Sequence, residues 1–196
     1  MLLNKLLFGF FCLALVIFAI GSASAAIGLT SCTNATSSSG QYELLSTLTS
    51  NATCLTLNAS NMDLDCKGNS IWFGANGGNG AIGINVLFGV VPLQNITIRN
   101  CVIRDINVSG TTGYGIQFTK TSSSFIYNNT VLTNGSSSNH GIYFNTNCNN
   151  NLIENNTISA FGTSTGNYGV YLLSASDENI IRRNVITGTG TTASHA

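Results

Sequence analysis

The sequence predicts an all-β protein, a right-handed parallel β-helix solenoid in which short strands stack from one coil to the next. Two observations predict it: a repeat along the chain, and a two-residue alternation of apolar side chains inside each repeat. The repeat is marked by isoleucines spaced 28, 27 and 28 residues apart, at Ile98, Ile126, Ile153 and Ile181. A nearly constant period of this size is the signature of a solenoid.

The first block of each repeat is a glycine followed by an alternating strand pattern. Its apolar pairs are Ile84/Val86, Ile116/Phe118, Ile142/Phe144 and Val170/Leu172. Alternation with period two places each pair on one face of a strand. The residues between them are therefore expected to point outward: Asn85, Gln117, Tyr143 and Tyr171.

The second block has the pattern aliphatic-x-x-Asn-x-aliphatic, as in Ile153, Asn156 and Ile158, and it recurs around Asn129 and Asn184. Cys101 takes the place of the asparagine in an earlier coil. Asparagine tolerates a left-handed backbone and hydrogen-bonds to a neighbouring turn. This block therefore predicts a strand, a sharp corner at the asparagine and a second strand.

A single coil of this kind cannot bury its own apolar face, whereas coils stacked about 4.8 Å apart form a continuous inner column. Parallel connections in such stacks are almost always right-handed. We expect about five coils over residues 54–196, joined by loops rich in Gly, Ser, Thr and Asn.

These repeats resemble those of right-handed parallel β-helix proteins of the pectate-lyase-like superfamily, in particular the NosD-like and the carbohydrate-binding or sugar-hydrolase repeats. The resemblance covers roughly residues 54–196, and residues 61–71 resemble the opening coil of such exported proteins. It implies the fold and leaves the function open, because function resides in sites placed on a fold.

Residues 1–25 have the features of a signal peptide. Lys5 precedes an unbroken apolar stretch of fifteen residues, Leu6 to Ile20, and Ala23-Ser24-Ala25 provides small residues for cleavage. We expect cleavage after Ala25 and a protein that is secreted or at the cell surface. The alternative is an uncleaved membrane anchor, for which fifteen apolar residues are short.

The sequence predicts different structures at the two ends of the solenoid. Residues 26–53 are expected to form a polar segment and an N-terminal cap, with residues 42–48 as a strand or a short helix. Ser194-His195-Ala196 resembles the opening of a further coil. We therefore expect that the chain continues beyond residue 196, or that an uncovered last coil associates end to end with another copy.

Removal of the signal segment leaves five cysteines, an odd number, so at least one thiol is free or bonded outside the chain. An exported chain can keep disulfides. Cys66 and Cys101 fall in the same block of successive coils, so we expect them to stack. Cys32 and Cys54 would join the N-terminal segment to the solenoid, which leaves Cys148 unpaired.

The composition argues against several partners and cofactors. A net charge of zero and scattered Lys and Arg residues argue against nucleic acid. The NosD-like resemblance implies copper ligands of the Met, His and Cys types. Because Met62, His140 and His195 are far apart in the sequence, we expect no metal and no other cofactor. Membrane contact is expected only through an uncleaved signal segment or through residues beyond 196.

The resemblance to β-helix polysaccharide enzymes makes carboxylates the first catalytic candidates. Such enzymes use paired acids for hydrolysis, or an acidic calcium site with a nearby base for elimination. The candidates are Asp63 and Asp65, on one face of a strand, with Arg99 one coil away. A structural ion pair is the alternative. Glu154 and Arg182 lie in equivalent positions of neighbouring coils and predict a surface ion pair.

Outward aromatic residues predict a surface that could contact sugar rings. Tyr114, His140 and Tyr168 precede the repeat glycine in successive coils, beside Tyr143 and Tyr171. The glycan-contact candidates are Tyr143, Tyr171, Gln117 and His140. The alternative is an aromatic ladder that only stiffens the solenoid.

Asn-x-Ser/Thr sequons would allow glycosylation of exposed asparagines in a source with the machinery. They begin at Asn34, Asn51, Asn58, Asn95, Asn107, Asn128, Asn134 and Asn155. We expect the two sequons inside the repeat blocks, at Asn128 and Asn155, to be inaccessible.

Two functional hypotheses follow. The first is an exported, non-catalytic β-helix module of the cell surface or the extracellular space, structural or adhesive, that contacts polysaccharide or cell-surface glycan. The second is a polysaccharide lyase or glycoside hydrolase whose catalytic coils lie outside this sequence or around Asp63, Asp65 and Arg99.

Overall fold

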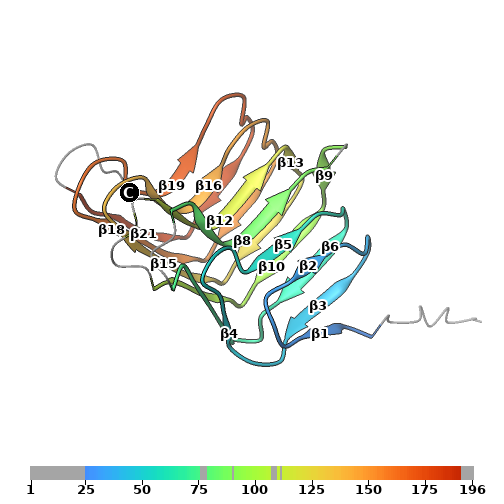
Figure 1. Cartoon of the computed structure of the whole chain (residues 1–196). Helices are drawn as coiled ribbons and strands as arrows, with labels where there is room; N and C mark the ends of the chain where they lie inside the picture. Colours follow the sequence, from blue (N-terminus) through green and yellow to red (C-terminus); the bar gives the residue numbers. More distant parts are fainter. Residues whose placement is uncertain (1–24, 76–78, 90, 107–109, 111, 191–196) are drawn as a thin grey trace, which may run out of the picture.

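The computed structural model describes residues 25–75, 79–89, 91–106, 110 and 112–190, and these residues form a parallel β-solenoid without helices (Figure 1). In this part of the chain, no helix is long and apolar enough to cross a membrane. Residues 1–24 of the expected signal peptide, which was predicted for residues 1–25, lie outside the described residues, as do His195 and the rest of the last six residues.

The described strands form three large parallel sheets of seven, six and six strands. Sheet 1 consists of β1 (Ile27–Leu29), β3 (Gln41–Leu44), β6 (Met62–Asp65), β10 (Ile96–Arg99), β14 (Phe125–Tyr127), β17 (Leu152–Glu154) and β20 (Ile180–Arg182). Sheet 2 consists of β4 (Leu48–Thr49), β7 (Ser70–Phe73), β11 (Val102–Asp105), β15 (Thr130–Gly135), β18 (Thr157–Gly162) and β21 (Val185–Gly188).

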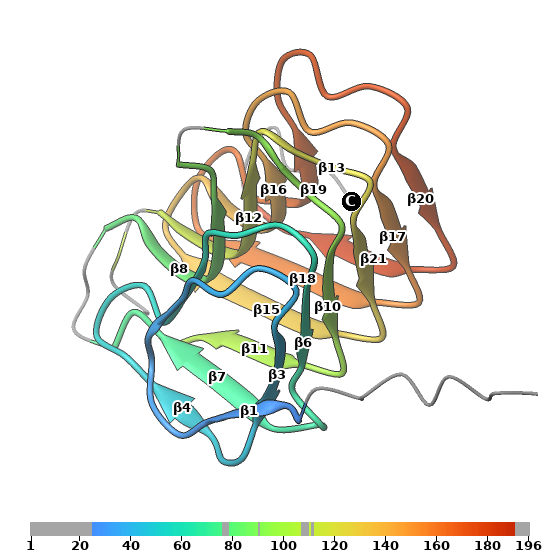
Figure 2. The ribbon, with the colours of Figure 1, turned by 90° about the vertical axis from the view of Figure 1, so that its right-hand side faces the viewer.

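Sheet 3 consists of β2 (Asn34–Ala35), β5 (Leu55–Leu57), β8 (Ala81–Leu87), β12 (Gly113–Thr119), β16 (Asn139–Phe144) and β19 (Tyr168–Leu172). A small fourth sheet pairs β9 (Leu93–Gln94) with β13 (Thr121–Ser122). From β3 onward, the chain runs from sheet 1 to sheet 2 to sheet 3 and then returns to sheet 1 one layer further on (Figure 2).

The predicted repeat sets the register in which the strands of these sheets pair. Ile98 pairs with Ile126, Ile126 with Ile153, and Ile153 with Ile181. Ile98, Ile126 and Ile153 are fully buried. Strand alternation therefore aligns one inward side chain per coil into a continuous apolar column, as the spacing of the isoleucines predicted.

The solenoid begins earlier in the chain than expected. Residues 26–53 were expected to be a polar segment and cap, but they contribute β1, β2, β3 and β4 to the three large sheets. Tyr42, Leu44 and Leu48 are buried in the common core. The coil count differs slightly from the five coils expected, and strands before residue 54 belong to the same sheets.

The corner between sheets 1 and 2 uses both asparagines of each Asn-Asn pair, in different roles. Asn128 and Asn155 adopt left-handed backbone, with φ of 56° each, and both are exposed. Asn129 and Asn156, the residues to which the sequence pattern assigned the corner, are 2% exposed. The expectation that Asn128 and Asn155 are inaccessible was therefore wrong by one residue in each pair.

The buried asparagines form a hydrogen-bonded ladder along the solenoid axis. Asn129 donates from its backbone N–H, 2.9 Å, and from Nδ2, 3.0 Å, to Oδ1 of Asn156. Asn156 donates in the same way to Oδ1 of Asn184, at 2.8 and 3.0 Å. Similar side-chain contacts join Asn139 to Asn167 and Asn151 to Asn179 at other corners. These contacts satisfy buried amide groups that the sharp corners remove from the strand ladders.

Both expected disulfides are present, with Cα–Cα distances of 4.6 Å for Cys32–Cys54 and 4.7 Å for Cys66–Cys101. The second occupies the corner where later coils have the asparagine ladder. Cys148 is free and buried, as expected. Burial raises the pKa of its thiol, so the sulfur remains protonated and unreactive at neutral pH.

The repeat glycine of sheet 3 is required by close packing. A Cβ at Gly141 would lie 2.2 Å from Cγ2 of Ile158 and 2.6 Å from the carbonyl oxygen of Gly169. A Cβ at Gly115 would lie equally close, at 2.2 Å, to Cγ1 of Val131, and a Cβ at Gly169 to Cγ2 of Ile186. The glycines therefore let sheet 3 approach sheet 2 at each coil.

Candidate functional site

The three catalytic candidates lie together on the outer face of sheet 1. Arg99 pairs with Asp65 in the strand register, and its guanidinium contacts both carboxylates. It donates to Asp63 through Nε at 3.0 Å and through a terminal nitrogen at 3.1 Å, and it lies 2.9 Å from Oδ2 of Asp65. The sequence therefore predicted the grouping correctly, and the structure shows it as a salt-bridge network.

Asp65 is the most enclosed member of this network, with 5% of its surface exposed. Its Oδ1 accepts hydrogen bonds from the Lys67 backbone N–H at 2.9 Å and from Asn100 Nδ2 at 2.8 Å. Burial alone would raise the pKa of Asp65, but the hydrogen bonds from Asn100 and Lys67 and the charge of Arg99 together hold it below its ordinary value.

This geometry suits a structural pair better than acid–base catalysis. A general acid at neutral pH needs a raised pKa and a free proton-transfer path, whereas Asp65 is held ionised and its oxygens are already hydrogen-bonded. The adjoining hollow, lined by Gln41, Glu43, Asp63 and Lys67 among others, has a volume of about 80 Å³. That is well below the roughly 300–1,000 Å³ of ordinary ligand pockets.

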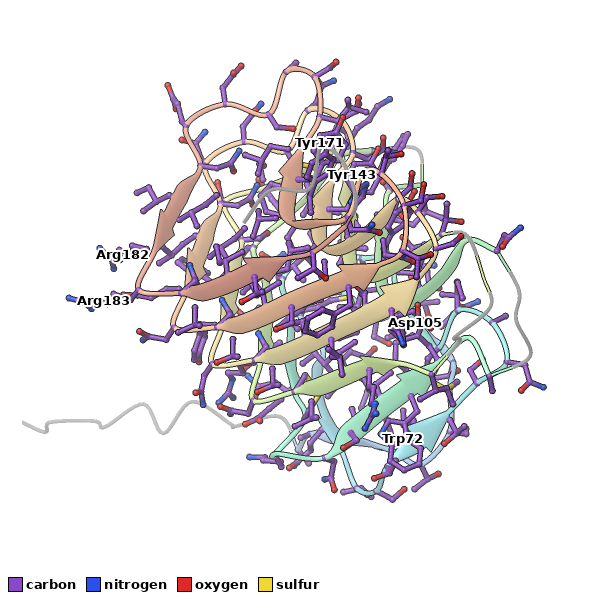
Figure 3. All side chains as sticks on the ribbon, turned by 90° about the vertical axis from the view of Figure 1, so that its left-hand side faces the viewer. Trp72, Asp105, Tyr143, Tyr171, Arg182 and Arg183 are labelled. Carbon is purple, nitrogen blue, oxygen red and sulfur yellow. A yellow bond between two sulfur atoms is a disulfide. The ribbon has the colours of Figure 1, made fainter. Side chains whose placement is uncertain are left out.

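The glycan-contact candidates lie on the strands β12, β16 and β19 of sheet 3. Figure 3 shows Tyr143 and Tyr171 apart from Arg182 and Arg183, which lie at the left edge of the view. Five rings from β12, β16 and β19 form what we call the aromatic face: Tyr114, His140, Tyr143, Tyr168 and Tyr171. The ring centroids of Tyr143 and Tyr171 are 5.5 Å apart and nearly parallel, with an interplanar angle of 11°. Their neighbours across the face, Tyr114 and Tyr168, approach them to 4.9 Å.

His140 is inside this cluster and is not available as a surface contact. Its ring stacks between Tyr114, at 5.2 Å, and Tyr168, at 5.3 Å, and only 5% of the residue is exposed. Burial lowers the pKa of His140 to about 4, so the imidazole is neutral at physiological pH. Stacking with residues one coil away buries it, so its place among the glycan-contact candidates is not supported.

Polar groups lie beside the exposed tyrosines. Gln117 shares a column with Asn85, Tyr143 and Tyr171. Gln117 Nε2 donates to Thr119 Oγ1 at 3.3 Å. The Tyr143 hydroxyl donates to Asn145 Oδ1 at 3.1 Å.

Thr119 and Asn145, which bind these side chains, were not among the candidates predicted from the sequence. Their position two residues after an outward Gln or Tyr was the signal that could have found them. The four tyrosines of the aromatic face and Gln117 are half-buried.

The described structure also places Met62 and Glu154. Met62 is 1% exposed and belongs to the core, and the described residues contain no group of three or more His, Cys, Asp or Glu side chains that could hold a metal ion. Glu154 forms the expected surface pair with Arg182, at 2.9 Å, and also contacts Arg183.

A second hollow follows the corner between sheets 1 and 2. It has a volume of about 350 Å³ and is lined by Lys67, Gly68, Asn100, Cys101, Val102, Asn128 and Thr130. Asn128 and Thr130 are the first and third residues of one sequon, and both are exposed. A glycan attached to Asn128 would lie at this hollow, which Cys101 also lines.

Comparison with known proteins supports the architecture. The model of the family described as right-handed β-helix region matches residues 45–196, which is well over half of the chain. Searches among curated proteins and among solved structures found no match. The matched region contains most of the stacked strands of all three large sheets, including the whole aromatic face. The chain is a member of the right-handed β-helix family.

Proposed function

We propose that this protein is an exported β-helix module that acts as a rigid scaffold outside the cell and binds glycan through its aromatic face. The observation that carries the proposal is the cluster of four half-buried tyrosines on β12, β16 and β19. Tyrosine combines an apolar ring with a polar hydroxyl, which suits a ligand that has both apolar C–H surfaces and hydroxyl groups.

The rigidity of the face favours binding. Each tyrosine is attached to a strand paired on at least one side, and its ring is held by contacts with neighbouring rings. Side chains that are already ordered lose little conformational entropy when a ligand binds. Gln117 and Asn145 add amide groups at the edge of the rings.

Two features support export. The first 25 residues have the composition of a signal peptide. The chain also carries two disulfides, which persist in oxidising compartments outside the cytosol.

The proposal is tested by affinity electrophoresis of the purified protein in gels that contain different soluble polysaccharides. We expect at least one polysaccharide to retard the protein. We expect the double variant Tyr143→Ser, Tyr171→Ser to be retarded less, because its affinity for that polysaccharide is about tenfold lower, equivalent to about 1.4 kcal/mol. Tyr127→Ser is the matched control, because Tyr127 is a half-buried tyrosine on the outer face of sheet 1.

Two results would contradict this function. Equal retardation of the wild type and the double variant would remove the aromatic face as the site, and no retardation in any gel would remove glycan binding. Cleavage of a polysaccharide that is lost in Asp65→Ala would instead identify an enzyme that uses the sheet 1 cluster.

A further inference from the structure

The charges of this protein are distributed unequally among its three large sheets. In sheet 3, the strand sequences are NA, LTL, AIGINVL, GYGIQFT, NHGIYF and YGVYL, and none contains Asp, Glu, Lys or Arg. In sheet 1, by contrast, five strands carry charges, with the sequences QYEL, MDLD, ITIR, LIE and IIR. The aromatic face thus lies on a sheet whose described strands are uncharged.

Three charged residues follow strands of sheet 3 along the chain. Lys120 follows β12 directly, but its ammonium lies 4.2 Å from the centre of the Phe88 ring, on the loop after β8. Asp177 lies in the loop after β19, where its backbone N–H binds Asn149 Oδ1 at 2.7 Å. Glu178 is exposed in the same loop.

Three titratable rings of the aromatic face are also neutral at physiological pH. Burial lowers the pKa of His140 to about 4 and raises the pKa values of Tyr114 and Tyr143. The imidazole is therefore deprotonated, and these two phenols are protonated, from about pH 5 to about pH 9.

The outward groups repeat along the solenoid axis. Asn85, Gln117, Tyr143 and Tyr171 form one column, with one residue in each coil. Equivalent backbone positions in adjacent strands are about 4.8 Å apart, and the two tyrosine rings of this column are 5.5 Å apart. A linear ligand parallel to the axis would therefore meet an amide or a phenol at each step.

We infer that the ligand of the aromatic face is a neutral, extended β-linked polysaccharide that lies along the solenoid axis, and not a polyuronate. This inference rests on the proposed function. An extended β-linked hexose chain advances by about one strand spacing per sugar, so successive sugars can lie over successive coils.

The absence of cations on the described strands of sheet 3 disfavours acidic sugars. Carboxylates brought to this face would lose hydration without gaining an ionic partner, and an unpaired charge is costly to desolvate. Neutral hydroxyls, in contrast, can exchange hydrogen bonds with water for bonds to Gln117 and the tyrosine hydroxyls at little net cost.

The experiment is calorimetric titration with two matched oligosaccharide series, neutral β-linked glucans and polyuronates, each from two to about six sugars. We expect the Kd for the neutral series to fall at least about tenfold with length, because longer chains engage more coils at once. We expect the Kd of the neutral series to change less than about twofold between about 0.05 and 0.5 M NaCl, because no charge pair is screened.

A charge variant sharpens the test. Gln117→Lys places an ammonium in the middle of the face, and we expect it to improve polyuronate binding about tenfold relative to neutral chains. Thr97→Lys is the matched control, since Thr97 is a half-buried outward residue on sheet 1 and should leave both series unchanged. Thermal denaturation of both variants establishes that they are folded.

The outcomes separate this inference from the proposed function. Tighter binding of polyuronates by the wild type, or binding that weakens steeply with salt, overturns the neutral ligand and keeps a glycan site. A neutral-chain Kd that does not depend on length overturns the axial orientation. If the protein binds neither series, the proposed function itself is contradicted.

Discussion

At the scale of single residues, Asn156 shows how a corner of the solenoid is held together. Its side chain accepts from the Asn129 backbone N–H and donates to the carbonyl oxygen of Ile126 at 2.9 Å and to Oδ1 of Asn184 at 3.0 Å. Asn155, the preceding residue, is exposed and has left-handed backbone with φ of 56°. Two identical side chains in succession thus have unrelated roles.

This difference predicts unequal effects of substitution. Asn156→Ala should lower the free energy of unfolding by about 2–4 kcal/mol, because several buried donors and acceptors lose their partners at once. Asn155→Gly should change it by less than about 0.5 kcal/mol, since glycine adopts the left-handed backbone without strain. Urea denaturation of both variants measures the two values. Similar losses would contradict the assignment of the ladder to the second asparagine.

At the scale of the elements, stacking of β12, β16 and β19 decides the protonation of His140. The Tyr114 and Tyr168 rings cover it from the two adjacent coils. The unfolded chain exposes the same imidazole to water, where its pKa returns to about 6.5. Folding therefore releases a proton whenever the pH lies between these two pKa values.

The pH dependence of stability follows from this shift. The pKa of His140 is lowered to about 4 in the folded protein, so the unfolded state binds more protons below about pH 6.5 and stability falls as the pH is lowered from 6.5 to 4. The total loss amounts to roughly 3 kcal/mol at about 1.4 kcal/mol per pKa unit.

His140→Phe tests this effect, because phenylalanine cannot be protonated and resembles the tyrosines above and below it. We expect the melting temperature of the variant to be nearly constant across pH 4.5–6.5, the interval in which the wild type loses stability. Asp65 and Glu154 do not titrate there, since both have pKa values below the ordinary carboxyl range. Parallel pH profiles for the two proteins would contradict the buried, neutral imidazole.

At the scale of the whole molecule, the stack is protected unevenly along its axis. β16, β17 and β18 each pair with a strand on both sides, whereas β19, β20 and β21 end their sheets among the described strands. Ile153 in the central column is fully buried, but Ile181, its neighbour in the last described coil, is 41% exposed.

Hydrogen exchange should report this gradient. We expect slow amide exchange at residues 141–158 and faster exchange at residues 169–186, because strands paired on one side open more easily. Sedimentation at several concentrations tests the expected end-to-end association through the same edges. Equal protection of both segments in a strictly monomeric protein would contradict both expectations.

The sequence by itself determined the solenoid, because its information is periodic and local. The spacing of Ile98, Ile126 and Ile153 set the register, and two-residue alternation identified Ile142 as inward and Tyr143 as outward. The cysteines were also paired correctly from their places in the repeat. Each of these conclusions needs only the distance along the chain and the geometry of a strand.

Tertiary structure alone decided which polar residues are buried. The sequence does not distinguish Asn128 from Asn129, since both suit a corner, and only the closed corner turns one outward and the other inward. The burial of His140 depends on rings 26 and 28 residues away, which come into contact only when the coils stack. Arg99 likewise meets Asp63 and Asp65 across 36 and 34 residues. Periodicity predicts that coils are neighbours, but side-chain packing between them determines exposure, charge and the surface available to a ligand.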